Sequence, residues 1–494
     1  MVQTIKNNLA LYTAFITSFL ISIGVNVISV LPHGTLIFGI VILAFFILLI
    51  FSLYFNHIEK ILILIALFLP IESLPGAKEA GYKDIDLTTP LLILSLLYLG
   101  AIVLLSLKFK FKRTSLDIPI LIFILAQVII IISTPWKIDT IIRYIKYDKI
   151  FFLYYLMILF LNTPKKVFKI SNIYIFSSIL VALYGLSVFA IFILTGERLW
   201  GLGFSLGYLP RIYGTMQDQN IFAAYMIVPL LLLFSYQFIS RNIIKQTLYR
   251  GCLVIIGMTI LLTWSRSGLL GLTVAVSIYL ILNRHIITKH ILTFVIIIPI
   301  LIGIVFSTTT AVGYSPTILI ERFTGEAKGT DQSDILHYYM AKLSWETFLA
   351  HPLGVGRSNL LRYIQDTEVD TQSFFVGRRG MDINGEIDGE YKGMPTHSSW
   401  LEILVSEGII GFMAFVGIVI ITIRHGVWTV RRTHDPTMRL IASSFTAGFC
   451  GVLASAIFYT FDWMYFFWFI IAMIMAMSAI TQQQLLESNH VEHA

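Results

Sequence analysis

Residues 36–53 read LIFGIVILAFFILLIFSL, a stretch that holds no charged side chain. At 1.5 Å per residue, a helix of this length spans most of a hydrocarbon core of about 30 Å. Ile291–Ser307 is a second stretch of this kind, and similar segments recur along the chain. Hydrophobic residues make up 57% of the 494 residues and charged residues only 13%, which excludes a water-soluble protein of this length. The sequence therefore predicts a polytopic integral membrane protein.

The chain contains about 14 apolar segments that are long enough, or nearly so, to cross a bilayer. The segments near residues 60–70 and 150–162 are short, so about 12 full spans is the alternative count. The predicted fold is an all-α transmembrane helical bundle with one large extracytoplasmic loop that is partly helical. Its expected parts are transmembrane helices 1–11 in residues 1–308, the loop in 309–397, transmembrane helices 12–14 in 398–480 and a cytoplasmic tail in 481–494.

Basic residues occur in short clusters between the apolar segments, although the chain has a net charge of +7. The five clusters are Lys108, Lys110, Lys112 and Arg113; Lys165, Lys166 and Lys169; Arg241, Lys245 and Arg250; Arg284 and Lys289; and Arg424, Arg431, Arg432 and Arg439. A nucleic-acid-binding protein gathers such residues in one groove or stripe, so we expect membrane lipids and no nucleic acid as partners. Because cytoplasmic loops are rich in Lys and Arg, we expect both termini in the cytoplasm. The expected outer segments are 70–88, 135–149, 196–219 and 309–397.

The first apolar segment is too long for the core of a signal peptide, and no small-residue cleavage pattern follows it. We therefore expect a retained first helix. Cys252 and Cys450 both lie in apolar helical surroundings, which predicts neither a disulfide nor a thiolate metal site. The sequence contains no nucleotide-binding loop, kinase motif or metal-ligand motif, so we expect no metal and no cofactor.

The loop at 309–397 differs from the rest of the chain in composition. It carries 12 of the 28 acidic residues and 8 Lys and Arg residues. Within it, Asp334–Ala350 has apolar and aromatic residues at helical spacing, which predicts an amphipathic helix lying over the membrane face. The stretch HPLGVGRSN at 351–359 breaks this helix, and residues 365–395 are typical of an irregular lid.

Two arginines near the ends of apolar segments are candidates for binding an anion, because ionisable residues are costly in membranes unless they have a function. Arg266 lies in TWSRSG, where its guanidinium and the following helix N-terminus would suit a phosphate. The alternative is an ordinary interfacial arginine in a tight turn. Arg211 lies in LPRIYGTMQDQN, before a helix that begins near Asn220, and here Asp218 or Asn220 is a candidate N-cap.

Arg143 and His397 are the other two candidates. Arg143 lies in PWKIDTIIRYIKYDK, a segment expected outside although it is rich in cations, which indicates an anionic ligand or a local error in the predicted sidedness. His397 lies where the loop re-enters the bilayer, and a histidine there could deprotonate a sugar hydroxyl. The alternative is an incidental histidine before a helix that is capped by Ser398 or Ser399 and carries Glu402 in its first turn.

Together these residues resemble the O-antigen ligase and polymerase family of bacterial envelope glycosyltransferases, over roughly residues 200–420. Three pieces carry the resemblance: the WSRSG turn at 264–268, the HPLGVG turn at 351–356, and a histidine block. That block comprises His397, Ser398, nine residues, Gly408, two residues and Gly411, and it is similar to the family signature His-[Asn/Ser/Gln]-x9-Gly-x2-Gly.

The resemblance implies a metal-independent, inverting glycosyltransferase in the bacterial cytoplasmic (inner) membrane. Its donor would be an undecaprenyl-diphosphate-linked glycan and its acceptor a sugar hydroxyl, on a growing glycan (a polysaccharide polymerase) or on a lipid-anchored core (an O-antigen ligase). By analogy, His397 would orient or deprotonate the acceptor, while Arg266 and Arg211 would hold the leaving diphosphate. Such an enzyme serves cell envelope biogenesis, in lipopolysaccharide or exopolysaccharide biosynthesis, and chain-length regulators or flippases are its expected partners.

The chain departs from the family pattern at two positions. Ser398 follows the histidine where family members commonly have asparagine. His337 stands about fifteen residues before the Pro of HPLGVG, where family members often carry an arginine, and a neutral histidine does not hold phosphate as arginine does. Arg322 or Arg357 would then supply that charge. A polysaccharide flippase is the competing hypothesis from another class, but the long loop and the absence of an internal repeat favour a transferase.

Overall fold

The computed structural model describes residues 58–71, 92, 112–205, 209–216, 218–284, 330–357, 359–366 and 396–492. The helices are α3 (Ile58–Phe68), α5 (Asp117–Ser133), α6 (Lys137–Phe160), α7 (Pro164–Thr195), α8 (Gln219–Ile239), α9 (Ile243–Leu262), α10 (Arg266–Leu282), α14 (Thr330–Ala350), α16 (Ser399–Arg432), α17 (Pro436–Ser455) and α18 (Tyr465–Glu492). A 3₁₀ helix, η1 (Leu360–Asp366), and two short strands, β1 (Leu202–Ser205) and β2 (Leu209–Ile212), complete the described elements.

The described helices form a bundle of membrane-spanning length, which confirms the predicted all-α polytopic fold. Six of them are long and apolar enough to cross a bilayer, namely α7, α8, α9, α16, α17 and the first part of α18. The helices α5 and α10 are shorter but also apolar. The predicted total of 12–14 spans depends in part on residues 1–57, 72–91, 93–111 and 285–329, which lie outside the described residues. The predicted spans Leu36–Leu53 and Ile291–Ser307 fall in these ranges.

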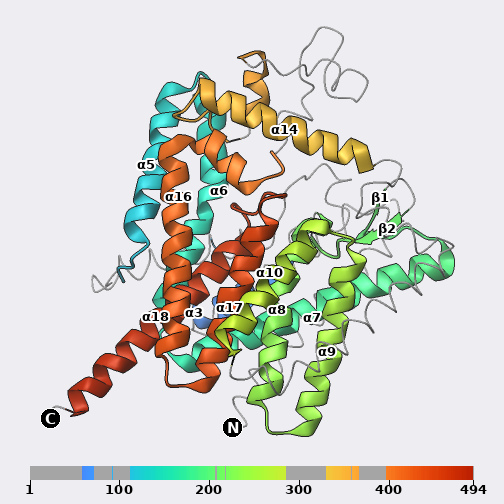
Figure 1. The fold of residues 1–494 in the computed structure, drawn as a ribbon, viewed down its shortest axis with the longest axis vertical. Coiled ribbons are helices and arrows are strands. Elements are labelled where there is room, and N and C mark those ends of the chain that lie inside the picture. Colours follow the sequence, from blue (N-terminus) through green and yellow to red (C-terminus); the bar gives the residue numbers. More distant parts are fainter. Residues whose placement is uncertain are drawn as a thin grey trace.

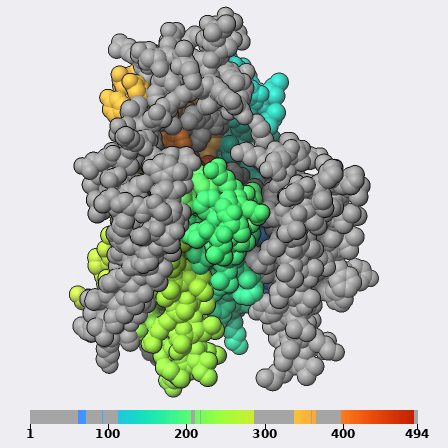
Figure 2. Space-filling model, turned by 90° about the vertical axis from the view of Figure 1, so that its right-hand side faces the viewer, coloured from blue at the N-terminus to red at the C-terminus, as the bar shows by residue number. Residues whose placement is uncertain are grey.

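Among the described residues, apolar side chains lie on the outside of the bundle as well as in its core. Figure 2 shows α7 and α9 side by side on one such face. The large exposed apolar residues of α5, α7 and α9 include Ile118, Leu121, Leu125, Ile132, Leu183, Leu194, Ile243, Ile244 and Leu248. Exposed apolar area of this extent would drive aggregation in water, but it is what a helix facing lipid presents.

The two ends of the bundle differ in their connections (Figure 1). One end, here called the loop end, holds the connections with the described residues 134–136, 196–205, 209–216, 218, 263–265, 351–357, 359–366, 396–398 and 456–464. The connections around residues 161–163, 240–242, 283–284 and 433–435 lie at the other, the basic end, together with the described members of the five basic clusters. The helix α14 lies across the loop end of the bundle, and its span includes the predicted helix Asp334–Ala350.

The helix α6 corrects one detail of the sequence-based division of the chain. The sequence predicts an outer segment over 135–149 and a separate apolar segment over 150–162, but α6 is one continuous helix. Its charged first half is tolerated because polar partners lie beside it at the loop end. Thr140 accepts a hydrogen bond from Asn359 at 3.1 Å, and Tyr144 donates one to Glu407 at 3.1 Å. The expected outer segment and the apolar segment that follows it are therefore parts of one helix.

Small residues allow α10 and α17 to pack closely near the loop end. A Cβ added to Gly271 would come within 2.6 Å of the carbonyl oxygen of Gly451. One turn away, the Ser455 hydroxyl donates to the carbonyl oxygen of Ser267 at 2.9 Å. Close backbone approach through small residues and interhelical hydrogen bonds is a common way for membrane helices to associate. This contact fixes the position of the first turn of α10, which begins at Arg266.

Candidate functional site

The turn between α9 and α10 is short and strained. Trp264 has a left-handed backbone with φ of 52°, which is unfavourable for a bulky residue. Ser265 is the N-cap of α10, and its hydroxyl accepts a hydrogen bond from the Gly268 N–H at 3.0 Å. Arg266 is the first residue of the helix. The structure thus places Arg266 at a helix N-terminus, which carries a partial positive charge of its own.

The β1–β2 hairpin braces this turn through Arg211. Arg211 is 8% exposed, and its Nε donates to the carbonyl oxygen of Thr263 at 2.8 Å. Its Nη2 donates to the carbonyl oxygen of Trp264 at 3.3 Å, and the Trp264 indole donates in return to the carbonyl oxygen of Pro210 at 3.1 Å. These bonds satisfy the carbonyl groups of Thr263 and Trp264, which directly follow α9, and hold the turn that precedes Arg266.

We expect replacement of Arg211 by methionine to destabilise the protein measurably. The apolar side chain would leave two buried carbonyl groups without their donor. Each such group lowers the free energy of unfolding by about 1–3 kcal/mol. The thermal unfolding midpoint in detergent should therefore fall by several degrees. The matched variant is Arg241→Met. Arg241 is exposed in the connection at the basic end, so this variant should have the unfolding midpoint of the wild type. Equal midpoints for the two variants would contradict the bracing role.

The N-terminus of α8 meets the same turn. Asp218 is the N-cap of α8, accepting from the Asn220 N–H at 2.6 Å, as one of the two sequence-based candidates predicts. The Asn220 side chain accepts a hydrogen bond from the Ser265 hydroxyl at 2.7 Å, which ties the α8 and α10 caps together. Burial raises the pKa of Asp218, and the amide of Asn220, the charge of Arg211 and the Tyr459 hydroxyl oppose that effect.

His397 lies directly before the N-terminus of α16, in a left-handed backbone conformation with φ of 58°. Ser398 is the N-cap, and Thr396 donates its N–H to the Glu402 carboxylate at 3.0 Å, so the capping expected around the histidine is present. The ring centroid of His397 lies 5.0 Å from that of His337 on α14 and 6.0 Å from that of Tyr459. His397 therefore lies between the capped N-terminus of α16 and the rings of His337 and Tyr459.

The Nε2 atom of His397 is buried and has no hydrogen-bond partner among the described residues. A buried polar atom of this kind costs free energy until a partner arrives. Burial first, and the neighbouring His337 second, lower the pKa of His397 to about 4. The ring is therefore neutral near pH 7, and a neutral ring nitrogen can accept a proton or a hydrogen bond from a hydroxyl.

Replacement of His337 by glutamine should move the acid limb of the activity profile. Only neutral His397 accepts a proton, so kcat/KM falls as the pH drops through the pKa of this histidine in the free enzyme. Removing His337 removes the second cause of the lowered pKa, which then rises towards 6.5. The acid limb of kcat/KM should shift to higher pH in a profile measured from pH 4 to 8. A limb that stays in place or moves to lower pH would contradict this coupling.

Tyr459 connects the His397 side of the site with the Arg266 side. It lies in the connection between α17 and α18, beside the His397 ring, and its hydroxyl hydrogen bonds to Asp218 at the start of α8. The Ser399 N–H donates to the carbonyl oxygen of Tyr459 at 3.1 Å, which holds the first turn of α16 against this connection. Three helix N-termini, those of α8, α10 and α16, therefore converge at the loop end. Their combined dipoles favour a bound anion.

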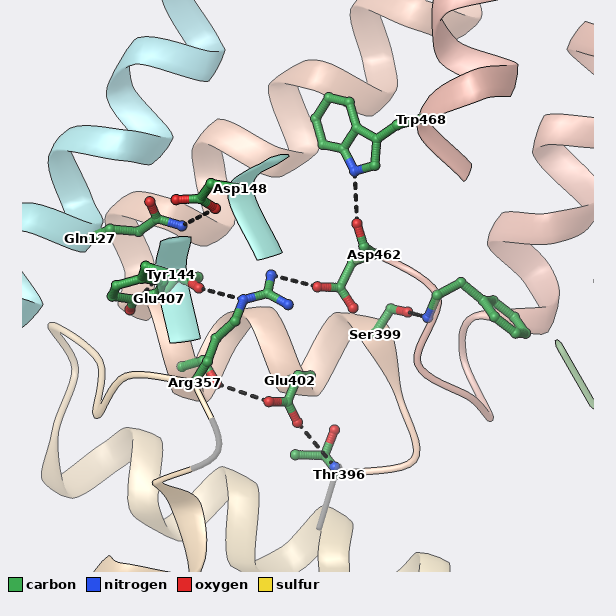
Figure 3. A network of polar contacts seen from close by, with 12 residues as sticks. Gln127, Tyr144, Asp148, Arg357, Thr396, Ser399, Glu402, Glu407, Asp462 and Trp468 are labelled. Carbon is green, nitrogen blue, oxygen red and sulfur yellow. Dashed lines mark hydrogen bonds and ion pairs between the residues drawn. The ribbon is translucent and has the colours of Figure 1, made fainter. Parts of the chain in front are cut away.

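Arg357 has a different environment from the one expected for a phosphate ligand. It is 4% exposed and lies between two carboxylates, with Nε 3.0 Å from Glu407 and Nη2 2.6 Å from Asp462 (Figure 3). Its guanidinium also lies 5.3 Å from the ring centroid of Tyr147. Two acidic partners already balance the charge of this arginine. The geometry favours a structural role over contact with the diphosphate.

Three further site residues were predicted from the sequence, namely Arg143, His337 and Arg322. Arg143 is half-buried on α6, directly before Tyr144, which donates a hydrogen bond to Glu407. His337 is brought against His397. Arg322 lies outside the described residues. Within the described part of the chain, no three His, Cys, Asp or Glu side chains converge as metal ligands would.

Three residues of the site were not singled out from the sequence. Tyr459 and Asp462 lie in FYTFDWMY, where an acidic residue between two apolar helices is a signal of function or buried pairing. Glu407 is the last of the nine residues between Ser398 and Gly408, and its position next to a signature glycine is a second usable signal.

Comparison with known proteins agrees with the resemblance seen in the sequence. Residues 251–416 match the family model described as O-antigen ligase, which confirms the expected O-antigen ligase/polymerase family. The matched region begins in α9 and includes the Arg266 turn, the HPLGVG turn and the His397 block. This family supports a membrane glycosyltransferase of the ligase or polymerase type. No curated protein matches the chain.

Proposed function

We propose that this chain, which carries an O-antigen ligase family domain in residues 251–416, transfers a glycan from undecaprenyl diphosphate to a sugar hydroxyl. The observation that supports this function best is the unpartnered Nε2 of His397 beside three converging helix N-termini. A hydroxyl is the partner that this nitrogen lacks, and a diphosphate is the anion that suits the helix ends and Arg266. The reaction then needs no resident metal.

In the proposed reaction, the acceptor oxygen attacks the anomeric carbon and its proton passes to Nε2 of His397. The bond between that carbon and the diphosphate oxygen breaks, and the electron pair leaves with the diphosphate. Attack from the face opposite the leaving group inverts the anomeric centre. Arg266 and the N-termini of α8 and α10 stabilise the charge that develops on the leaving oxygen.

Binding of the lipid-linked donor would also change the basicity of His397. A pKa near 4 makes His397 a weak base in the free protein, since a general base works best with a pKa near the operating pH. Bound diphosphate would bring negative charge close to the ring and raise its pKa. His397 then becomes a stronger base only when a donor is in place, which suppresses proton uptake in its absence.

The lipid carrier accounts for the position of the site. The converging N-termini lie at the ends of apolar helices, the depth at which a diphosphate headgroup lies when its polyprenyl chain remains in the bilayer. We assign the loop end to the outer face of the cytoplasmic membrane, with both chain termini in the cytoplasm, because the basic clusters gather at the opposite end. Polymerisation of cell-surface repeat units is the favoured activity, and ligation to a lipid-anchored core is the alternative.

The decisive experiment supplies one donor and two acceptors. Protein purified into lipid nanodiscs is mixed with an undecaprenyl-diphosphate oligosaccharide and either a second lipid-linked repeat unit or a lipid-anchored core sugar. Longer lipid-linked glycans indicate a polymerase, and a glycosylated core indicates a ligase. Movement of the donor across a vesicle bilayer without a new glycosidic bond would overturn the transferase in favour of a flippase.

A further inference from the structure

The helix α16 is broken at Gly408, nine residues after its start. Gly408 has φ of 65° and ψ of −173°, a conformation essentially confined to glycine, and it separates the segment 399–407 from the long remainder of the helix. A Cβ at this position would collide with the carbonyl group of Leu353. The nine residues between Ser398 and Gly408 therefore form one short helix of roughly 14 Å, with His397 just before its start.

The HPLGVG turn fills the break. In an unbroken helix the Ile409 N–H would bond to the carbonyl oxygen of Val405. Here Ile409 donates to the carbonyl oxygen of Pro352 at 2.9 Å, and Val405 accepts from the Val355 N–H at 3.0 Å. The Gly356 N–H likewise donates to the carbonyl oxygen of Ser406 at 2.9 Å. Three backbone hydrogen bonds thus join residues 352–356 to the two sides of the break.

Arg357 follows the turn directly and adds an ion pair to this junction. It contacts Glu407, the last residue of the short helix, and Asp462 in the connection between α17 and α18 (Figure 3). Gly411 leaves room for this arrangement, because a Cβ there would collide with the Glu407 side chain. Both signature glycines, Gly408 and Gly411, therefore leave room for the contacts at the break in α16.

The short helix is fixed at its other end to the same connection. The Ser399 hydroxyl accepts from the Phe461 N–H at 2.7 Å, and the Ser399 N–H donates to the carbonyl oxygens of Ala456 and Tyr459. Segment 399–407 is thus held by residues 456–464 at its start and by Arg357 and Asp462 at its end. A shift at the Arg357 end of such a short rigid element would move His397 at the other.

We propose that the turn 352–356 and Arg357 form a clamp that positions the 399–407 helix, and that Arg357 is a positioning residue for His397. This inference rests on the proposed function of His397 and adds the device that holds it in place. The helix α14, which ends at Ala350 and carries His337, connects directly to the clamp. Docking of α14 on the bundle and placement of His397 are therefore coupled through one junction.

The test compares Arg357→Gln with Arg362→Gln. Arg362 lies in the same segment but pairs with Asp139, which is half exposed at 51%, so its loss should matter little. Hydrogen exchange is measured on full-length protein in nanodiscs, together with kcat and the donor KM. Arg357→Gln should speed exchange in peptides covering 352–360 and 399–409 but not in α10. It should lower kcat roughly 10–100-fold, the usual cost of misplacing a reacting group, with little change in donor KM.

Arg357→Lys keeps one positive charge and serves as a second variant in case the first one misfolds. It should give intermediate exchange and intermediate kcat, since an ammonium cannot bridge two carboxylates as the guanidinium does. A raised donor KM with unchanged exchange would overturn the clamp in favour of direct diphosphate contact. Faster exchange with unchanged kcat would also overturn it. An active His397→Ala variant would instead refute the proposed function, whatever the exchange shows.

Discussion

Replacement of His397 by alanine should reduce glycosyl transfer by about 10²–10⁴-fold, the usual contribution of a general base. Alanine removes the only described nitrogen that is buried beside Tyr459 without a hydrogen-bond partner. Ser398 still caps α16 and Ser399 still contacts the 456–464 connection, so the fold should persist. Turnover is measured with the lipid-linked donor in nanodiscs, and folding is measured by the thermal unfolding midpoint.

The matched control is His434→Ala. His434 is exposed in the connection between α16 and α17 at the basic end, the end of the bundle opposite to the converging N-termini. It should retain the turnover of the wild type. If His397→Ala shows the same turnover as this control, the general-base assignment fails. If His397→Ala loses turnover only because it unfolds, the midpoint will reveal that.

Hydropathy predicted the membrane class and most of the described helices, because the cost of exposing backbone polar groups to lipid forces apolar segments into helices. It did not show that a helix continues where polar neighbours replace lipid. Charged residues in the first half of α6 predicted an outer segment apart from the apolar segment that follows, whereas α6 is one helix in which Thr140 and Tyr144 pair with residues more than two hundred positions away. The β1–β2 hairpin was also missed, since β2 is held in part by Arg211, which bonds to a turn about fifty residues further on.

The site was predictable in its residues but not in its geometry. The signature spacing singled out His397, Gly408 and Gly411, and the apolar context singled out Arg266. The spacing alone does not reveal that nine residues form one short helix or that residues 352–356 enter its broken end. Those contacts join segments about fifty residues apart, and local propensity carries no information about them. Arg357 therefore resembled a phosphate ligand in the sequence and is an ion-pair partner in the structure.

The arrangement separates two electrostatic tasks. Arg266 begins α10, one of the three converging helix N-termini at which we propose that the diphosphate binds. The acidic side chains Glu407 and Asp462 are instead paired with Arg357. Removing one partner of such a buried pair is costly, because the other charge remains uncompensated in a medium of low polarity. Arg266 is thus proposed to act on the leaving group directly, whereas Arg357 acts through the position of the short helix 399–407.

Replacement of Arg266 by alanine should lower kcat and kcat/KM together by about 10²–10³-fold, the magnitude typical of losing one transition-state donor. The loss is expected in kcat because negative charge on the leaving diphosphate increases as the glycosidic bond breaks. Arg266→Lys should recover only part of the rate, since lysine supplies a point charge without the two-pronged geometry of a guanidinium. Inhibition by inorganic diphosphate should weaken most in Arg266→Ala and less in Arg266→Lys.

Arg284→Ala provides the matched control for Arg266, because Arg284 lies just beyond the opposite end of the same helix, α10, and is exposed. It should leave turnover and diphosphate inhibition unchanged. Equal turnover in Arg266→Ala and Arg284→Ala would show that Arg266 is an ordinary interfacial arginine. A rise in donor KM at constant kcat would show that Arg266 binds the donor equally in the ground state and the transition state. Only a parallel loss of kcat and diphosphate inhibition supports stabilisation of the leaving group by this arginine.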